Sequence, residues 1–118
     1  MVPSGEIVEH TFRERPIGLA SGGLLELLSV SIHMHQLGSS GRLRLFDGKR
    51  TTTLLDIPRW DFDWQLEYRL VEPVRLSAYA RLELTCEHDN TEGTEDVRWG
   101  EASSDEMCGA TAYVVQTR

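Results

Sequence analysis

Apolar and polar residues alternate in short segments along most of the chain. A period of two residues is typical of β-strands with one buried face, and the longer period of an amphipathic helix is hard to find here. Val, Leu, Thr and aromatic residues fill these segments, while Gly, Asp, Asn and Pro separate them. The pattern predicts seven strands, near residues 5–12, 24–35, 41–46, 50–57, 62–71, 77–87 and 107–116.

Turn signals stand between these segments, at Ser21-Gly22-Gly23, residues 38–41 (GSSG), Asp47-Gly48, Pro58 and Asp89-Asn90. The LLELL stretch that begins at residue 24 is compatible with a helix, but the β-branched residues after it favour a strand. Short strands at regular spacing predict an all-β fold, an antiparallel β-sandwich of jelly-roll type. The acidic stretch 89–106 is expected to be a long loop.

The length and the net charge of the chain exclude several classes of function. With 118 residues, the chain is expected to form a single domain over residues 1–118. The formal net charge of −7 argues against nucleic acid or an anionic membrane as the main partner, because both reward clustered Lys and Arg. No apolar run approaches the roughly 20 residues of a membrane helix. The first ten residues lack the basic and apolar regions of an export signal.

The stretch HMHQLG places two of the chain's four histidines one residue apart. On a strand both imidazoles point the same way and are close enough to hold one ion, whereas on a helix they would lie on nearly opposite sides. Strand histidines are more often solvated or hydrogen-bonded than metal-bound, so the spacing alone does not establish a site. Alternation also predicts a core face of Leu28, Val30, Ile32 and Met34, and an outer face of Ser29, Ser31, His33 and His35.

A second stretch, SSDEMCG, supplies the adjacent Met107 and Cys108. Cys108 and Cys86, the only cysteines, are compatible with one disulfide, two metal ligands or two buried thiols. If they are bonded to each other, Met107 is held on the other face, where it can meet His33 and His35. Two imidazoles and a thioether suit copper, because thioether selects Cu(I) and imidazole serves both Cu(I) and Cu(II). Zinc would instead recruit a third histidine, a carboxylate or thiolates.

The sequence resembles the C-terminal catalytic domain of the copper type II, ascorbate-dependent monooxygenases. This family includes peptidylglycine alpha-hydroxylating monooxygenase and dopamine beta-monooxygenase. HMHQLG, TCEHDN and GEASSDEMCG carry the resemblance, and their order and separation fit that domain over roughly residues 24–116. The family fold, a β-sandwich of jelly-roll type, agrees with the strand pattern.

The resemblance implies a site and a chemistry. The HxH histidines and the EMC methionine of the family bind its catalytic copper, which implies His33, His35 and Met107 as ligands here. A family disulfide corresponds to Cys86 and Cys108, and a disulfide implies an exported protein, periplasmic or extracellular. Copper, with ascorbate as the reductant, would use O2 to hydroxylate an activated C–H bond of a small-molecule substrate.

Three features depart from the family pattern. The family holds a second copper with histidines of an N-terminal domain, and the remaining histidines here are not arranged in that way. The chain is therefore expected to need an N-terminal copper domain or another electron donor. Ser31, Gly109 and Thr111 replace the arginine, asparagine and tyrosine that grip the carboxylate of peptidylglycine substrates, so such a substrate is not expected. The extra disulfide of animal peptidylglycine enzymes has no cysteines here, which is closer to the pattern of bacterial relatives.

Other candidate residues have simpler expected roles. His88 is expected in a turn or at the surface, with a place behind the metal ligands as the alternative, and His10 is expected to be an exposed strand residue. Trp60, Phe62 and Trp64 are expected to form a core face, with stacking against a substrate as the alternative.

Three functional hypotheses follow. The first is an oxygenase domain, the second is a copper-binding or carrier module without turnover, and the third is a metal-free sandwich that only packs or binds partners. Asp105 and Glu106 are expected to shape the turn before Met107, and orienting a ligand imidazole is their alternative role.

Overall fold

The residues that the structure describes form seven β-strands, in the order that the alternating pattern predicts. The structure is a computed structural model that describes residues 1–15 and 24–117. The strands are β1 (Ile7–Glu14), β2 (Leu24–Met34), β3 (Gly38–Phe46), β4 (Thr51–Ile57), β5 (Tyr68–Leu76), β6 (Arg81–Asp89) and β7 (Cys108–Thr117). Across the described residues, no helix has the length and apolarity to cross a membrane.

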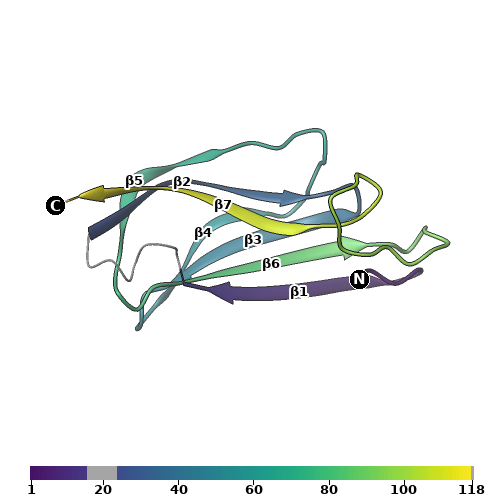
Figure 1. Cartoon of the computed structure of the whole chain (residues 1–118), viewed down its shortest axis with the longest axis horizontal. Helices are drawn as coiled ribbons and strands as arrows, with labels where there is room; N and C mark the ends of the chain where they lie inside the picture. Colours follow the sequence, from purple (N-terminus) through teal and green to yellow (C-terminus); the bar gives the residue numbers. More distant parts are fainter. Residues whose placement is uncertain (16–23, 118) are drawn as a thin grey trace.

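The strands are arranged in two sheets that face each other (Figure 1). One sheet has the strand order β1-β6-β3-β4, and the other has the order β5-β2-β7. Every pairing in both sheets is antiparallel. The predicted all-β antiparallel sandwich is therefore confirmed.

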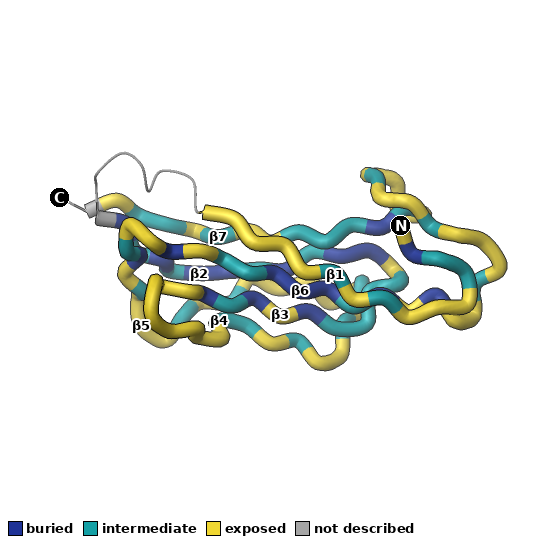
Figure 2. Tube along the Cα trace, turned by 90° about the horizontal axis from the view of Figure 1, so that it is seen from below, coloured by how far each residue is buried: buried dark blue, intermediate teal, exposed yellow. Residues whose placement is uncertain are grey.

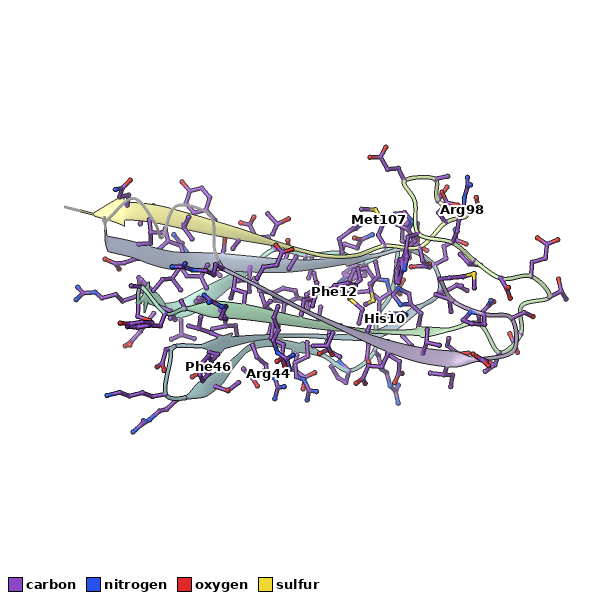
Figure 3. All side chains as sticks on the ribbon, turned by 60° about the horizontal axis from the view of Figure 1, so that its bottom comes forward. His10, Phe12, Arg44, Phe46, Arg98 and Met107 are labelled. Carbon is purple, nitrogen blue, oxygen red and sulfur yellow. A yellow bond between two sulfur atoms is a disulfide. The ribbon has the colours of Figure 1, made fainter. Side chains whose placement is uncertain are left out.

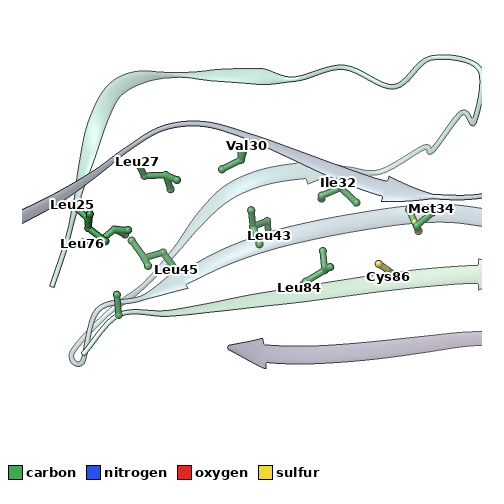
Figure 4. Packing of buried hydrophobic residues seen from close by; sticks show 11 residues of the cluster. Leu25, Leu27, Val30, Ile32, Met34, Leu43, Leu45, Leu76, Leu84 and Cys86 are labelled. Carbon is green, nitrogen blue, oxygen red and sulfur yellow. The ribbon is translucent and has the colours of Figure 1, made fainter. Parts of the chain in front are cut away.

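The core lies between the two sheets, where the inward side chains of β2, β3 and β6 meet (Figure 4). Its most deeply buried members, none more than 1% exposed, are Leu27, Val30, Met34, Leu43, Ala80 and Cys86. Figure 2 shows the same pattern along the chain, with buried positions on the central strands and long exposed stretches on β1 and β5. The period of two arises because each strand buries only one face.

A β-bulge in β2 changes the predicted core face. The register of β2 with both neighbours shifts between Leu27 and Ser29. An extra residue in one strand reverses the alternation, so Leu25 and Leu27 are buried before the bulge and alternate residues of 30–34 are buried after it. Leu28 is half-buried and lies outside the core cluster, so its placement in the core face was wrong.

The fifth strand lies later in the chain than the pattern predicts. β5 begins at Tyr68 instead of residue 62, and residues 60–67 form an irregular connection. β5 continues through Pro73, which an edge strand tolerates because its outer N–H groups need no partner. The alternation in WDFDWQ was therefore not a strand signal.

The turn after β2 lies at residues 36–37, earlier than the predicted residues 38–41. Gly38 already pairs with His88 in the sheet, and the backbone N–H of Gly38 donates to His35 O at 3.2 Å. The turn expected at residues 38–41 is therefore part of β3. The turn expected at Ser21-Gly22-Gly23 lies outside the described residues.

The predicted long loop connects β6 to β7 at the end of the sandwich where β2 ends. Val97 in this loop pairs with Val2, and Trp99 pairs with Glu106. These bridges attach the loop to the N-terminal residues and to the start of β7. The loop thereby brings residues 105–107 against the end of the histidine strand.

Candidate metal centre

His33 and His35 lie at the end of β2, and their rings are close. The two ring centroids are 5.0 Å apart, with the ring planes 77° from parallel. His33 is half-buried, and His35 is only 5% exposed. The extended backbone places the two imidazoles side by side, as the spacing predicts.

Hydrogen bonds fix the same tautomer in both rings. His35 Nδ1 lies 3.0 Å from Asp105 O, a carbonyl that only accepts, so Nδ1 carries the proton. His33 Nδ1 lies 2.7 Å from Gln65 Oε1, and Gln65 Nε2 in turn donates to Phe62 O at 2.9 Å. That second bond orients the Gln65 amide, so Oε1 accepts from His33. Both rings therefore keep the lone pair on Nε2, which is the state that binds a metal.

The connection between β4 and β5 packs against the histidines. Phe62 meets the His35 ring edge-on at a centroid distance of 6.0 Å, and Trp60 Nε1 donates to His35 O at 3.2 Å. Trp60 also packs against the core, as expected, and Phe62 is half-buried. Trp64 is 72% exposed, so its predicted place in a core face was wrong. Gln65 was not predicted, and no spacing in the sequence links it to His33.

Met107 immediately precedes β7, directly after the residues that contact His35 (Figure 3). In the register of β2 with β7, His33 lies opposite Gly109 and Met34 lies opposite Cys108. The paired register ends there, so His35 and Met107 are the residues that directly follow and precede the paired strands.

A disulfide anchors this end of β7. Cys86 and Cys108 are bonded across a separation of 22 residues, with their Cα atoms 5.9 Å apart. Cys86 lies on β6 and is fully buried, so the bond ties the two sheets together next to Met107. The expected pairing of the two cysteines is present.

Glu106 is a buried carboxylate that holds the end of β2. Its Oε1 accepts from the backbone N–H of His35 at 2.9 Å, and its Oε2 accepts from that of Leu37 at 2.8 Å. The residue is 1% exposed. Burial raises the pKa of Glu106, but hydrogen bonds from His88, Leu37 and His35 lower it more, so the pKa lies below its usual value. Its role is backbone anchoring, in line with the expected role in shaping this turn; orientation of a ligand imidazole was the alternative.

His88 is fully buried on β6, so its predicted place in a turn or at the surface was wrong. Its Nε2 lies 3.0 Å from Glu106 Oε1 and 3.1 Å from Met107 O, both of which accept. Strand alternation explains the burial, because residue 88 shares the inward face of Cys86. The sequence alone could have predicted this burial, because a buried Cys86 on a strand implies that residue 88 also faces inward.

His10 lies on β1 as predicted, but it is half-buried rather than exposed. Its ring meets Trp99 edge-on at a centroid distance of 5.1 Å, and Trp99 also meets His88 edge-on at 5.3 Å. Burial, the N-terminal amino group and His88 lower the pKa of His10, in that order of importance. His10 therefore packs away from the pair at residues 33 and 35.

Most of the chain matches the sequence model of one known protein family. Residues 11–115 match the sequence model of the family described as copper type II ascorbate-dependent monooxygenase, C-terminal domain. The chain belongs to this family. The match begins within β1, earlier than the residue 24 expected from the motifs, so β1 is part of the family domain. No curated protein is significantly similar to the chain.

The donor types in this copper monooxygenase domain fit copper better than zinc. In the part of the chain that the structure describes, no three His, Cys, Asp or Glu side chains gather into a metal-binding group. Both cysteines are bonded in the disulfide. The thioether of Met107 is a ligand type that selects Cu(I), and imidazole serves both copper states.

The residues directly beside His33 on β2 and β7 are small and uncharged. Ser31 lies opposite Thr111, and Gly109 lies opposite His33. The three positions that depart from the peptidylglycine enzymes therefore stand together on the histidine face. Their side chains have no positive charge with which to bind a substrate carboxylate.

Proposed function

We propose that this domain binds one copper ion through Nε2 of His33, Nε2 of His35 and the sulfur of Met107, and that it uses O2 to hydroxylate a C–H bond of a small molecule. When bound, copper supplies redox cycling between Cu(I) and Cu(II) and an open position for O2. The proposal rests above all on the hydrogen bonds at the two Nδ1 atoms, because they leave both Nε2 lone pairs available.

The surrounding residues prepare the site in this proposal. Gln65 and the carbonyl of Asp105 hold the two imidazoles in one orientation. Glu106 fixes the backbone on which His35 is mounted. Phe62 covers one side of the His35 ring and limits its contact with water. Preorganised ligands need little rearrangement when the metal binds or changes its oxidation state.

The reaction needs an electron donor. Hydroxylation of one C–H bond by O2 forms an alcohol and water, and it consumes two electrons and two protons. We propose ascorbate as their source, delivered through an N-terminal copper domain or another electron-donating partner. The family's ascorbate dependence supports this source.

We further propose an exported location and a substrate other than a peptidylglycine. The Cys86–Cys108 bond favours an oxidising compartment, such as the periplasm or the extracellular space. The neutral surface around Ser31, Gly109 and Thr111 favours a substrate without a carboxylate at that point.

The first test is copper binding by a Met107→Ile variant. We expect Cu(I) affinity to fall by about 10-fold or more, because the soft ligand is lost, while Cu(II) affinity changes much less. Competition with a chromogenic Cu(I) chelator, without oxygen, measures the first quantity. Met34→Leu is the matched control, because Met34 is fully buried in the core and its substitution should leave Cu(I) affinity unchanged. Equal Cu(I) affinity in the Met107 variant and the parent would remove Met107 from the site.

The second test separates oxygenase from carrier. The copper-loaded protein is given O2, ascorbate, an electron-donating copper domain and a panel of small molecules with activated C–H bonds. Hydroxylated product that disappears in the Met107→Ile variant supports the oxygenase. Copper binding without product under every condition would support the carrier module instead.

A further inference from the structure

Both imidazoles of the candidate metal centre donate to a neutral acceptor. His33 Nδ1 donates to the amide oxygen of Gln65 at 2.7 Å, and His35 Nδ1 donates to the backbone carbonyl of Asp105 at 3.0 Å. In the part of the chain that the structure describes, no carboxylate forms a hydrogen bond or an ion pair with either ring. In many metal sites the ligand histidine donates to a carboxylate instead, and this makes the imidazole more basic. The kind of acceptor therefore influences how each ring binds a metal.

Two carboxylates lie close to the rings but are bonded elsewhere. Asp105 gives only its backbone carbonyl to His35, and its carboxylate accepts from Arg98 (labelled in Figure 3) at 3.4 Å. The carboxylate of Glu106 accepts from backbone N–H groups at the end of β2 and lies 3.0 Å from His88 Nε2. The carboxylate–histidine pair at this end of the sandwich thus involves His88, which is not one of the proposed ligands.

The β4–β5 connection also offers carboxylates close to His33. Asp63 lies two residues before Gln65, and the Asp61 carboxylate accepts from the backbone N–H of Asp63 at 2.9 Å. The side chain that reaches His33 is nevertheless an amide, and its Nε2 donates to Phe62 O at 2.9 Å. A carboxylate cannot make that donation. The local backbone therefore favours a neutral amide at this position.

The charge of these acceptors affects how the site divides its affinity between the two copper states. Cu(II) has one more positive charge than Cu(I), so a carboxylate behind a ligand ring stabilises Cu(II) more and lowers the reduction potential. A neutral acceptor stabilises Cu(II) less. Burial has the same effect, because His35 is only 5% exposed and a site with little water favours the lower charge.

We propose that Gln65 keeps the reduction potential of the bound copper high, so that one electron from the donor readily converts Cu(II) to Cu(I). This inference rests on the proposed copper site and names a residue that regulates it. Gln65 acts through His33 Nδ1, while the metal would be bound by Nε2 of the same ring. Gln65 is therefore a positioning residue, and its effect is on the copper potential as well as on the orientation of the ring.

The test compares the whole parent chain with Gln65→Glu and Gln65→Leu, using copper alone as the probe. Competition with chelators measures the Cu(I) and Cu(II) affinities, and a redox titration measures the potential. We expect Gln65→Glu to raise the ratio of Cu(II) to Cu(I) affinity by at least about 10-fold, which lowers the potential by about 59 mV. Gln65→Leu only removes the acceptor, so both affinities should fall while their ratio changes little.

Trp64→Glu is the matched control for charge. Trp64 is 72% exposed and adjacent to Gln65, so the variant adds the same charge to the same connection without an acceptor for His33. We expect little change in the affinity ratio, because solvent screens an exposed charge. The Nδ1 proton of His33, followed by NMR in the diamagnetic Cu(I) form, should move downfield in Gln65→Glu and stay in place in Trp64→Glu.

Two results would overturn the role of Gln65. One is the same ratio of Cu(II) to Cu(I) affinity in the parent, Gln65→Glu and Gln65→Leu, which is the result of a purely structural role. The other is an equal fall in potential for Trp64→Glu and Gln65→Glu. If the parent binds one copper ion through Met107 in either case, the proposed metal site stands without this role. A parent that binds no copper would overturn both proposals.

Discussion

At the start of β7, the Glu106 carboxylate joins three distant segments of the chain. It accepts hydrogen bonds from the end of β2, through the backbone of His35 and Leu37, and from His88 on β6. The disulfide links β6 to β7 two residues away on each strand. One covalent bond and a set of buried hydrogen bonds therefore hold these strands together. Glu106 also directly precedes Met107, whose backbone N–H donates to Glu106 Oε1 at 3.3 Å.

We predict that Glu106→Gln weakens Cu(I) binding through the position of Met107. An amide keeps one accepting oxygen and cannot hold all the donors that now surround the carboxylate. Loss of such a supporting group typically lowers metal affinity by about 10- to 100-fold. Cu(I) affinity is measured for Glu106→Gln, for Met107→Ile and for the double variant. The expected result is non-additive, with little further loss in the double variant.

Glu83→Gln is the matched control for that experiment. It removes one carboxylate charge from an ion pair on the outer face of β6 and should leave Cu(I) affinity unchanged. Should Glu106→Gln fail to fold, His88→Gln keeps a donor to Glu106 and His88→Phe does not, so only the second should weaken Cu(I) binding. Equal Cu(I) affinity in the parent, Glu106→Gln and His88→Phe would refute the positioning role.

At the scale of elements, the site depends on close packing between β3 and the β4–β5 connection. A Cβ atom on Gly38 would lie 2.7 Å from Trp60 Cδ1 and 2.9 Å from Met34 Cβ. Only glycine therefore allows Trp60 to approach closely enough to donate to His35 O. The irregular connection that replaces the predicted strand is what brings Phe62 and Gln65 to the histidines.

Gly38→Ala should lower the free energy of unfolding by about 1–3 kcal/mol, because the added methyl group overpacks a rigid contact. Urea unfolding followed by tryptophan fluorescence measures the change. Gly109→Ala is the control, since a Cβ at that position meets nothing within 4 Å and should cost little. Similar stability of the two variants would show that Trp60 moves freely.

Ion pairs also link the strands β1, β6 and β3. Glu83 on β6 binds Arg44 on β3 and Arg13 on β1. Hydrogen bonds from Arg44 and then Arg13 lower the pKa of Glu83. A carboxyl with a lowered folded pKa stabilises the fold above its unfolded pKa, about 4.3, and this contribution disappears as the pH falls through the folded pKa.

The stability difference between the parent and Glu83→Gln should therefore be largest near neutral pH and shrink below about pH 4. Its size should be roughly 1 kcal/mol or less, because both arginines are partly exposed. Urea unfolding at several pH values measures it. A difference that stays constant into the acid range would contradict a role for the ionised carboxylate.

At the scale of the whole molecule, the disulfide links the two sheets covalently. The sheets otherwise contact each other only through a small hydrophobic core. Closing the loop between Cys86 and Cys108 restricts the unfolded chain. The core is correspondingly modest, because Phe12, Trp64 and Val71 remain exposed rather than buried. The disulfide is therefore expected to supply a large share of the stability.

Reduction should lower the free energy of unfolding by roughly 3 kcal/mol, the value of the chain-entropy model for a loop of this length. Urea unfolding with and without a reductant that does not bind copper measures the change. Thiol counting in denaturant, before reduction, is the control and should find no free thiol. Two free thiols in the native protein would contradict the bond.

The sequence alone determined the features that depend on local chemistry. Alternation predicted seven strands because each strand buries one face, and it placed His33 and His35 side by side for the same reason. The resemblance of TCEHDN and SSDEMCG to the family's motifs predicted the Cys86–Cys108 bond.

Tertiary structure alone decided what depends on contacts between segments far apart in the chain. The bulge after Leu27 changes which alternate residues of β2 face the core, and no residue pattern within that strand predicts the bulge. Gln65, Glu106 and His88 acquired their roles only when the β4–β5 connection, β7 and β6 met at the end of β2.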